Sequence, residues 1–204
     1  MYTRWPPPSP PSRNERCFGY RRTAIIVALF LAGIAPPNNV LLAQQSGEID
    51  REYTIKGAFL YNFGRYVQWP AAAYVDEHAP FVIGVLGTDP FGAVLDEIAS
   101  SSKVDGRPVV AKRFATMAEY SPCQILFIAA SADAKVKTDA LAKLQSKGVL
   151  LVGEEPGLVQ QGAVVSFYVE NNKVRFEINV ETAKQQQLKV SSKLLSLAKI
   201  VGTP

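Results

Sequence analysis

Three short runs of apolar residues without polar alternation mark the middle of the chain. They are FVIGVL (81–86), ILFIA (125–129) and VLLV (149–152). A strand that is apolar on both faces is typical of a parallel sheet covered by helices on each side. These runs therefore predict the buried strands of an α/β domain, and residues 107–114 predict a further strand.

Segments with a helical period of apolar residues separate these strands. In 51–68 such residues recur every three to four positions, and Trp69-Pro70 ends the pattern because a residue before proline avoids the α region. Asp89-Pro90 predicts the start of a second helix. Ser131 predicts the cap of a third helix, which runs to about Ser146.

Apolar and polar positions alternate in the C-terminal part of the chain. Val164–Glu170 and Lys173–Ile178 flank Asn171-Asn172, a pair that tolerates the positive φ of a tight hairpin turn. A short helix is expected over 180–187, and Ser191 or Ser192 predicts the cap of a final amphipathic helix with apolar positions as far as Val201.

This order of elements predicts a single α/β domain. The expected architecture is a three-layer αβα sandwich, with a mostly parallel sheet and an antiparallel C-terminal hairpin at one edge.

The first 43 residues differ from the rest of the chain in charge. They hold five arginines and one glutamate, which leaves 17 Lys+Arg and 17 Asp+Glu in the remaining 161 residues. The net charge of +4 therefore belongs to the N-terminal segment. A nucleic-acid partner is not expected, because the rest of the chain carries no excess of positive charge.

That segment has the pattern of an export signal. Arg21-Arg22 precede Ala24–Ala35, an apolar stretch as long as a signal-peptide core and short for a bilayer span. Ala43 offers a small residue for cleavage. We expect a signal peptide at 1–43 with a proline-rich upstream extension, and a periplasmic domain at 44–204 without stable membrane insertion. An uncleaved anchor is the alternative, which Pro36-Pro37 disfavours.

Residues able to perform catalysis or bind metal are scarce. The one histidine, His78, lies in a polar connector, where an exposed imidazole is favoured over a catalytic base. Cys123 is the only cysteine after residue 43, and a buried thiol is favoured over an intermolecular disulfide. The sequence therefore predicts no catalytic set, no metal site and no cofactor.

Two weaker signals concern ligand sites. The first is a set of three glycines, Gly84, Gly87 and Gly92. Their spacing is GxxGxxxxG, whereas the dinucleotide-binding fingerprint is GxGxxG, so roles in close packing and in a turn are favoured over phosphate binding. Glu154-Glu155 follow a strand, where open α/β sheets bind ligands. Paired carboxylates can do acid–base work, but no nucleophile complements them, so a solvated turn is favoured.

Six motifs spread over residues 57–201 carry a family resemblance. They are GAFLYNFGRYVQWP (57–70), FVIGVLGTDPFG (81–92), GRPVV (106–110), SPCQILFIA (121–129), VLLVGE (149–154) and VRFEINVETAKQQQLKVSSKLLSLAKIV (174–201). In this order they resemble the periplasmic YfiR/HmsC-like proteins. The resemblance implies a regulator that binds and represses the periplasmic sensor domain of an inner-membrane diguanylate cyclase, lowering cyclic-di-GMP and biofilm or exopolysaccharide output.

The resemblance also bears on disulfides. Similar proteins often place a cysteine in the first strand that pairs with the one matching Cys123. Gly84 occupies that strand here, so redox control by an internal disulfide is not expected.

Two groups of polar residues amid apolar ones are candidates for docking the partner. They are Tyr61, Arg65, Gln68 and Trp69 on the first helix, and Glu177 and Asn179 after the hairpin. Tryptophan and arginine are enriched at the energetic centres of interfaces. An alternative has equal weight with this docking role. In it, Trp69 completes the core and Glu177 is an ordinary charged residue of an edge strand. Two further possibilities stay open. The protein could form a homodimer, and its function could be that of a small-molecule-binding module that feeds another envelope signalling protein.

Overall fold

The computed structural model describes residues 39–202, and side chains from residue 50 onward. The predicted signal-peptide core at 24–35 lies outside this range, and nothing in it tests cleavage after Ala43. Helix α2, Asn39–Tyr66, begins well before the apolar period that predicts it at 51–68. No helix within residues 39–202 combines the length and the hydropathy needed to cross a membrane.

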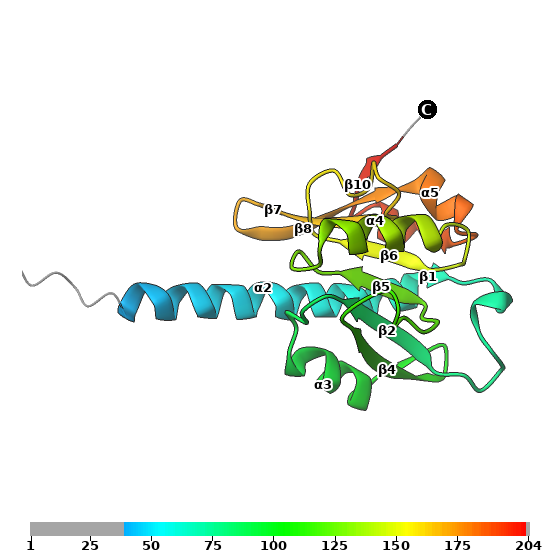
Figure 1. Ribbon diagram of the computed structural model, residues 1–204, viewed down its shortest axis with the longest axis horizontal. Helices are drawn as coiled ribbons and strands as arrows, with labels where there is room; N and C mark the ends of the chain where they lie inside the picture. Colours follow the sequence, from blue (N-terminus) through cyan, green and yellow to red (C-terminus); the bar gives the residue numbers. More distant parts are fainter. Residues whose placement is uncertain (1–38, 203–204) are drawn as a thin grey trace, which may run out of the picture. The chain divides into compact units, whose positions relative to one another are not determined.

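One eight-stranded sheet forms the centre of the fold, in the order β10-β8-β7-β6-β5-β2-β4-β3 (Figure 1). The strands are β2 Phe81–Leu86, β3 Lys103–Val104, β4 Arg107–Phe114, β5 Ile125–Ile128, β6 Leu150–Gly153, β7 Val165–Glu170, β8 Lys173–Asn179 and β10 Lys199–Val201. Strands β4, β2, β5, β6 and β7 are parallel neighbours, whereas β7 and β8 form an antiparallel hairpin. The predicted α/β fold with a mostly parallel sheet is confirmed.

The hairpin turn has the predicted conformation. Asn171 and Asn172 have φ values of 51° and 57°, the pair of positive angles that a two-residue type I′ turn requires. Strand β10 pairs with β8 in parallel and therefore lies outside the hairpin, at the very edge of the sheet.

Strand β10 replaces most of the predicted C-terminal helix. Helix α6 spans only Ser192–Leu195, capped by the hydroxyl of Ser191, and the prediction that a helix continues toward Val201 is wrong. Leu194 is buried and Leu195 and Ala198 pack against the core, but Leu197 and Ile200 are 61% and 44% exposed, so only part of the apolar stripe faces the core. Pairing with β8, and not a helix, provides hydrogen-bond partners for the backbone groups of 199–201.

Successive residues of the central strands point into two separate cores. Phe81, Ile83 and Val85 of β2 belong to one cluster, and Val82 and Leu86 belong to the other. The same alternation recurs in β5 and β6, as the period of two in a β-strand requires. Both faces of the sheet are covered, which explains why these strands read as continuous apolar runs.

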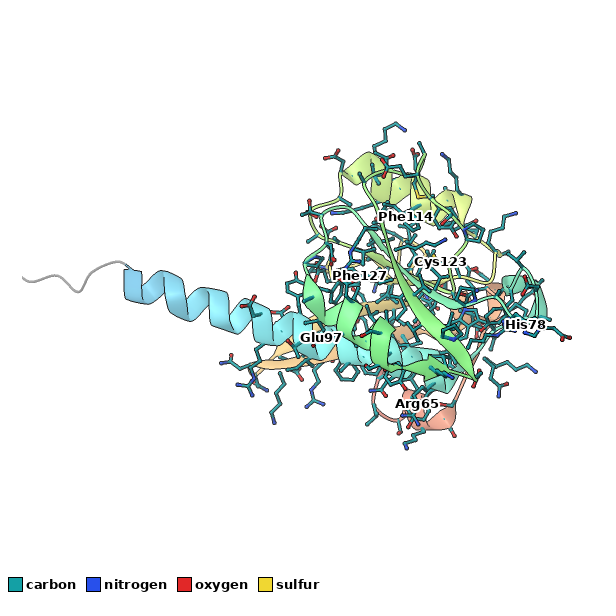
Figure 2. All side chains as sticks on the ribbon, turned by 90° about the horizontal axis from the view of Figure 1, so that it is seen from below. Arg65, His78, Glu97, Phe114, Cys123 and Phe127 are labelled. Carbon is teal, nitrogen blue, oxygen red and sulfur yellow. The ribbon has the colours of Figure 1, made fainter. Side chains whose placement is uncertain are left out.

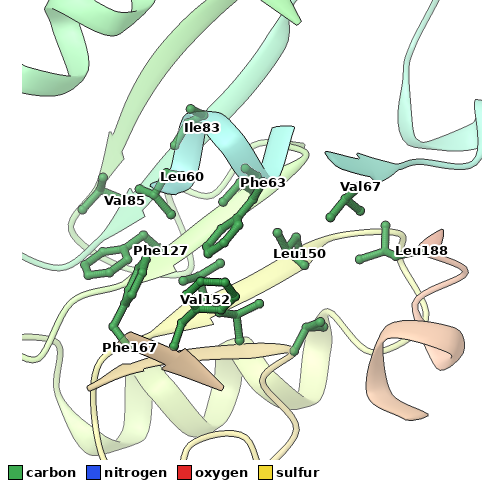
Figure 3. Packing of buried hydrophobic residues seen from close by; sticks show 14 of the residues in the cluster. Leu60, Phe63, Val67, Ile83, Val85, Phe127, Leu150, Val152, Phe167 and Leu188 are labelled. Atoms are coloured by element: carbon green, nitrogen blue, oxygen red, sulfur yellow. The ribbon is translucent and has the colours of Figure 1, made fainter. Parts of the chain in front are cut away.

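Helices cover the two faces and complete the three layers. We call the cluster that contains Phe81, Ile83 and Val85 the first core. It also contains Leu60 and Phe63 of α2 and Leu95 of helix α3, Ala93–Ser101. Figure 3 shows Phe63 and Leu60 among side chains from several strands, including Phe127 and Phe167. On the other face, Ala140 and Leu141 of α4, Ala134–Lys143, pack in the second core.

Two predicted helix starts are wrong, by three residues for α3 and by two residues for α4. Asp89-Pro90 does not open α3; the Asp89 carboxylate accepts the Phe91 N–H (2.8 Å) in a turn, and Gly92 is the residue before the helix. Ser131 does not cap α4, which ends at Lys143 rather than near Ser146. Its hydroxyl instead accepts the Thr88 N–H (3.0 Å), which ties the loop after β5 to the loop after β2.

A second, smaller sheet lies at the end of α2. Strand β1, Val67–Gln68, pairs antiparallel with β9, Lys189–Val190, which follows the short helix α5, Val180–Gln185. Val67 is buried against the core, and the Ser191 N–H donates to the Tyr66 carbonyl (2.9 Å). This pairing holds the segment 189–193 beside the last turn of α2.

Candidate partner-binding surface

The last turn of α2 and the segment after α5 together form an exposed surface. We call it the Arg65 surface; its residues are Tyr61, Arg65, Tyr66, Gln68, Lys189 and Lys193. Arg65, Tyr66, Gln68 and Lys189 line a shallow cavity of about 250 Å³, together with Val190 and Ser191. Figure 2 shows Arg65 at the surface of the molecule.

Aromatic rings support the cations of this surface. The Arg65 guanidinium carbon lies 5.8 Å from the ring centroids of both Tyr61 and Tyr66. Lys193 Nζ lies 5.0 Å from the Tyr66 ring centroid and donates to its hydroxyl oxygen (3.2 Å). These contacts hold the long side chains next to the helix end, where the helix dipole also favours positive charge.

The Arg65 surface is positively charged. Among the described residues, Arg65, Lys189 and Lys193 make no ion pair with a carboxylate. The hydrogen bond from Lys193 and its charge lower the pKa of the Tyr66 phenol. The surface is therefore suited to an acidic group of a partner.

Trp69 has a structural role beside this surface. Its Nε1–H donates to the Gln124 carbonyl oxygen (3.0 Å), and its ring lies edge-on to Phe81 at a centroid distance of 5.0 Å. It is half-buried and packs against the first core. Gln68, in contrast, is exposed and pairs with Lys189 in the small sheet. The alternative that Trp69 completes the core thus has direct support in its contacts.

Glu177 and Asn179 make their contacts elsewhere. Glu177, on β8, faces Lys199 of the neighbouring β10 at 3.7 Å. The Asn179 side chain accepts the Thr182 N–H (3.0 Å) and so caps α5. The structure therefore brings Tyr61, Arg65, Gln68 and Trp69 together around the end of α2, and gives Glu177 and Asn179 separate roles within the sheet.

Three residues of the Arg65 surface are not predicted from the sequence: Tyr66, Lys189 and Lys193. Tyr66 fits the apolar period of α2, which favours a place in the core. The two lysines lie far along the chain, in a segment whose only signal is the polar pattern KVSSK (189–193). The pairing of β1 with β9 brings them to Arg65, and strands of two residues leave no periodic signal.

The carboxylates at the strand ends are engaged within the fold. Glu154 accepts from Lys56 Nζ (2.6 Å), from the Ala130 N–H (3.0 Å) and from the Tyr53 hydroxyl (3.3 Å). Glu155 is ion-paired with Lys137. Tyr53 and Lys56 of α2 thus occupy the end of β6, the position at which the sequence offers paired carboxylates for a ligand or for acid–base chemistry. Glu154 holds the helix to the sheet.

His78 and Cys123 lie in different surroundings in the described part of the chain. His78 is exposed, and its backbone N–H donates to Asp76 (2.7 Å). Cys123 is buried and unpaired, as expected, and burial raises the pKa of its thiol to about 12. In the part of the chain with described side chains, no cluster of three or more His, Cys, Asp or Glu residues could hold a metal ion.

Comparison with solved structures yields distant similarities. One is a conserved domain protein from Vibrio cholerae O1 biovar El Tor, with 13% identity and a TM-score of 0.45 over 59% of this chain and 54% of that one. Another is the ABC domain in complex with L-Trp from Streptococcus pneumonia, with 12% identity and a TM-score of 0.45 over 59% of this chain and 55% of that one. The chain thus spans about half the length of these two structures.

Comparison at the level of families is more specific. No curated protein matches the sequence. The family model described as YfiR/HmsC-like matches residues 53–199, which include every strand of the central sheet except the last two residues of β10. The expected resemblance is confirmed, and this chain belongs to the YfiR/HmsC-like family.

Proposed function

We propose that this protein binds and represses the periplasmic sensor domain of an inner-membrane diguanylate cyclase. Repression lowers cyclic-di-GMP and, with it, biofilm and exopolysaccharide output. The observation that carries the proposal is the YfiR/HmsC-like match over 53–199, because membership supports a periplasmic regulatory role in cyclic-di-GMP signalling.

The Arg65 surface supports a docking site for this partner. Its three cations are accessible, have no described carboxylate partner and lie beside aromatic rings. Arginine and tyrosine are enriched among residues that dominate binding energy. Complementary charge steers association, so the sensor domain should present acidic side chains to this surface.

Export is part of the same proposal. Arg21-Arg22, the apolar stretch 24–35 and Ala43 predict cleavage before Gln44. Sequencing of the N-terminus of the native protein should begin at or near Gln44. A native chain that retains 24–35 within the membrane fraction would contradict this part of the proposal.

The test of function is deletion of the gene followed by complementation. Deletion should raise cellular cyclic-di-GMP, and the wild-type gene should restore the lower level. The double variant Arg65→Glu/Lys189→Glu should be exported and folded but should fail to restore it, because two attractive contacts become repulsive. Cyclic-di-GMP is measured by mass spectrometry of cell extracts.

A matched control separates the surface from net charge. Lys135→Glu/Lys184→Glu changes the same charge on two exposed lysines of α4 and α5, and it should complement as well as the wild type. An unchanged cyclic-di-GMP level after deletion would overturn the proposed function. Full complementation by Arg65→Glu/Lys189→Glu would overturn only the docking site.

A further inference from the structure

A cavity of about 310 Å³ opens at the amino ends of β5 and β6. Its apolar lining includes Ala72, Ala73, Pro122, Leu144 and Val149, with the Tyr120 ring and the Cys123 thiol. Cys123 lies just before β5 and Val149 just before β6. The cavity is therefore at the opposite end of the strands from Glu154, and none of the residues of the Arg65 surface lines it.

Two buried glutamines fix the walls of this cavity. Gln124 donates from Nε2 to the Ala73 carbonyl (2.6 Å) and accepts the Val82 N–H (2.8 Å), which fastens the turn 71–73 to β2. Gln186 donates to the Leu144 carbonyl (2.9 Å). Its Oε1 accepts the N–H groups of Lys147, Gly148 and Val149 at 3.1, 3.1 and 3.4 Å. Both walls are thus held in place by groups that are removed from solvent, as in a preformed site.

Charge at the rim of the cavity has one sign. Lys143 and Lys147 line it and are exposed, and no acidic residue does. Within the described part of the chain neither ammonium group makes an ion pair. Asp139, one turn before Lys143 on α4, pairs with Lys135 (2.8 Å). The Cys123 thiol stays neutral because burial raises its pKa to about 12, so the interior is apolar and uncharged.

We propose that this cavity binds a small amphipathic anion, an apolar body that carries a carboxylate or a similar acidic group. The apolar walls accept the body, and Lys143 and Lys147 bind the acidic group at the rim. The volume lies at the lower end of the range for small-molecule sites, which suits a compact ligand. This inference does not depend on the cyclase partner.

The test uses a probe of this chemical class and its neutral counterpart. The purified protein is titrated with 8-anilinonaphthalene-1-sulfonate, and separately with N-phenyl-1-naphthylamine, which lacks the sulfonate. Lys143→Gln/Lys147→Gln should weaken binding of the sulfonate about tenfold, because two charge contacts are lost, and leave the neutral probe unchanged. Octanoate should displace the sulfonate at concentrations at which 1-octanol does not.

Two further variants locate the bound probe. Ala72→Trp, at an exposed position of the rim, should fill the cavity and weaken both probes about tenfold or more; thermal unfolding checks that it is folded. Lys173→Gln/Lys184→Gln removes the same charge from two exposed lysines that do not line the cavity, and it should leave both affinities unchanged. The proposal is overturned if the sulfonate does not bind. It is also overturned if Lys143→Gln/Lys147→Gln binds the sulfonate as tightly as the wild type does, or if 1-octanol displaces the sulfonate as well as octanoate does.

Discussion

Lys56 Nζ lies 2.6 Å from Glu154 Oε2, and the two side chains are only 5% and 6% exposed. This ion pair joins α2 to the end of β6. The Tyr53 hydroxyl and the Ala130 N–H also donate to Glu154, so the buried carboxylate is fully hydrogen-bonded. Burial and the charge of Glu154 together hold the pKa of the Tyr53 phenol well above its usual value. The contact closes the strand-end region that open α/β folds commonly use for ligands.

Loss of Glu154 should therefore destabilise the fold strongly. Glu154→Ala leaves Lys56 charged in a buried position and should lower the free energy of unfolding by about 3 kcal/mol. Lys56 also pairs with Glu52, which is more exposed, so Glu52→Ala should cost less than about 1 kcal/mol. Urea unfolding followed by circular dichroism measures both. Equal effects of the two variants would contradict a special role for the buried pair.

The Cys123 thiol should be unreactive in the folded protein. Burial raises its pKa from 9.0 to about 12, which lowers the thiolate fraction near pH 8 about a thousandfold. Labelling by a disulfide reagent should thus be slow and should accelerate only when urea unfolds the chain. Fast labelling without denaturant would contradict burial.

The same shift has a consequence for stability. Since the pKa is higher in the folded than in the unfolded chain, the stabilising contribution of the neutral thiol is complete below about pH 9 and is lost as the pH rises toward 12. The unfolding free energy of the wild type should therefore fall more steeply above pH 9 than that of Cys123→Ala. Parallel slopes for the two proteins would show that the thiol is not buried as described.

Gly84 should not tolerate a side chain without a compensating change. A Cβ atom at this position would lie 2.8 Å from Phe114 Cε2 and 3.1 Å from Leu126 Cδ1. Gly84→Ala should therefore lower the free energy of unfolding by about 1–3 kcal/mol, the usual cost of overpacking. Chemical denaturation of the purified variant measures this loss.

A second substitution tests the cause. Phe114→Leu makes room next to residue 84, so Gly84→Ala/Phe114→Leu should be more stable than the sum of the two single effects predicts. Strict additivity would mean that Phe114 is not the obstacle. The same close packing explains why this strand contains a glycine within an apolar run.

The buried centre of the fold could be predicted from the sequence because its signal is local. The runs at 81–86, 125–129 and 149–152 are apolar on both faces, and the structure places each in a parallel sheet between two cores. The turn at Asn171-Asn172 could be predicted for the same reason, since its residue types set the backbone angles.

The edge of the sheet and half of the candidate surface could not be predicted. Residues 199–201 have an apolar pattern compatible with a helix, and only the free edge of β8 makes them a strand. Lys189 and Lys193 join Arg65 only because Val190 pairs with Val67. Both results depend on contacts between segments that are distant in the chain, and residue patterns within one segment carry no information about them.

Arg65 and Trp69, which the sequence groups together, should behave differently when they are replaced. Arg65 is exposed, and among the described side chains it makes only cation–π contacts, so Arg65→Ala should leave the unfolding free energy within about 0.5 kcal/mol of the wild type. Trp69→Ala removes the hydrogen bond to Gln124 and the packing on Phe81, and should cost about 3 kcal/mol or more.

Binding should follow the opposite order. If the Arg65 surface docks an acidic partner, Arg65→Ala should weaken the complex by about 2 kcal/mol, and raising the salt concentration should weaken the wild-type complex more than the variant complex. Trp69→Phe keeps an aromatic ring on Phe81 and should bind as the wild type does once it is folded. Isothermal titration with the isolated sensor domain at two salt concentrations measures these differences. Full affinity and unchanged salt dependence in Arg65→Ala would place the docking site on another face of the protein.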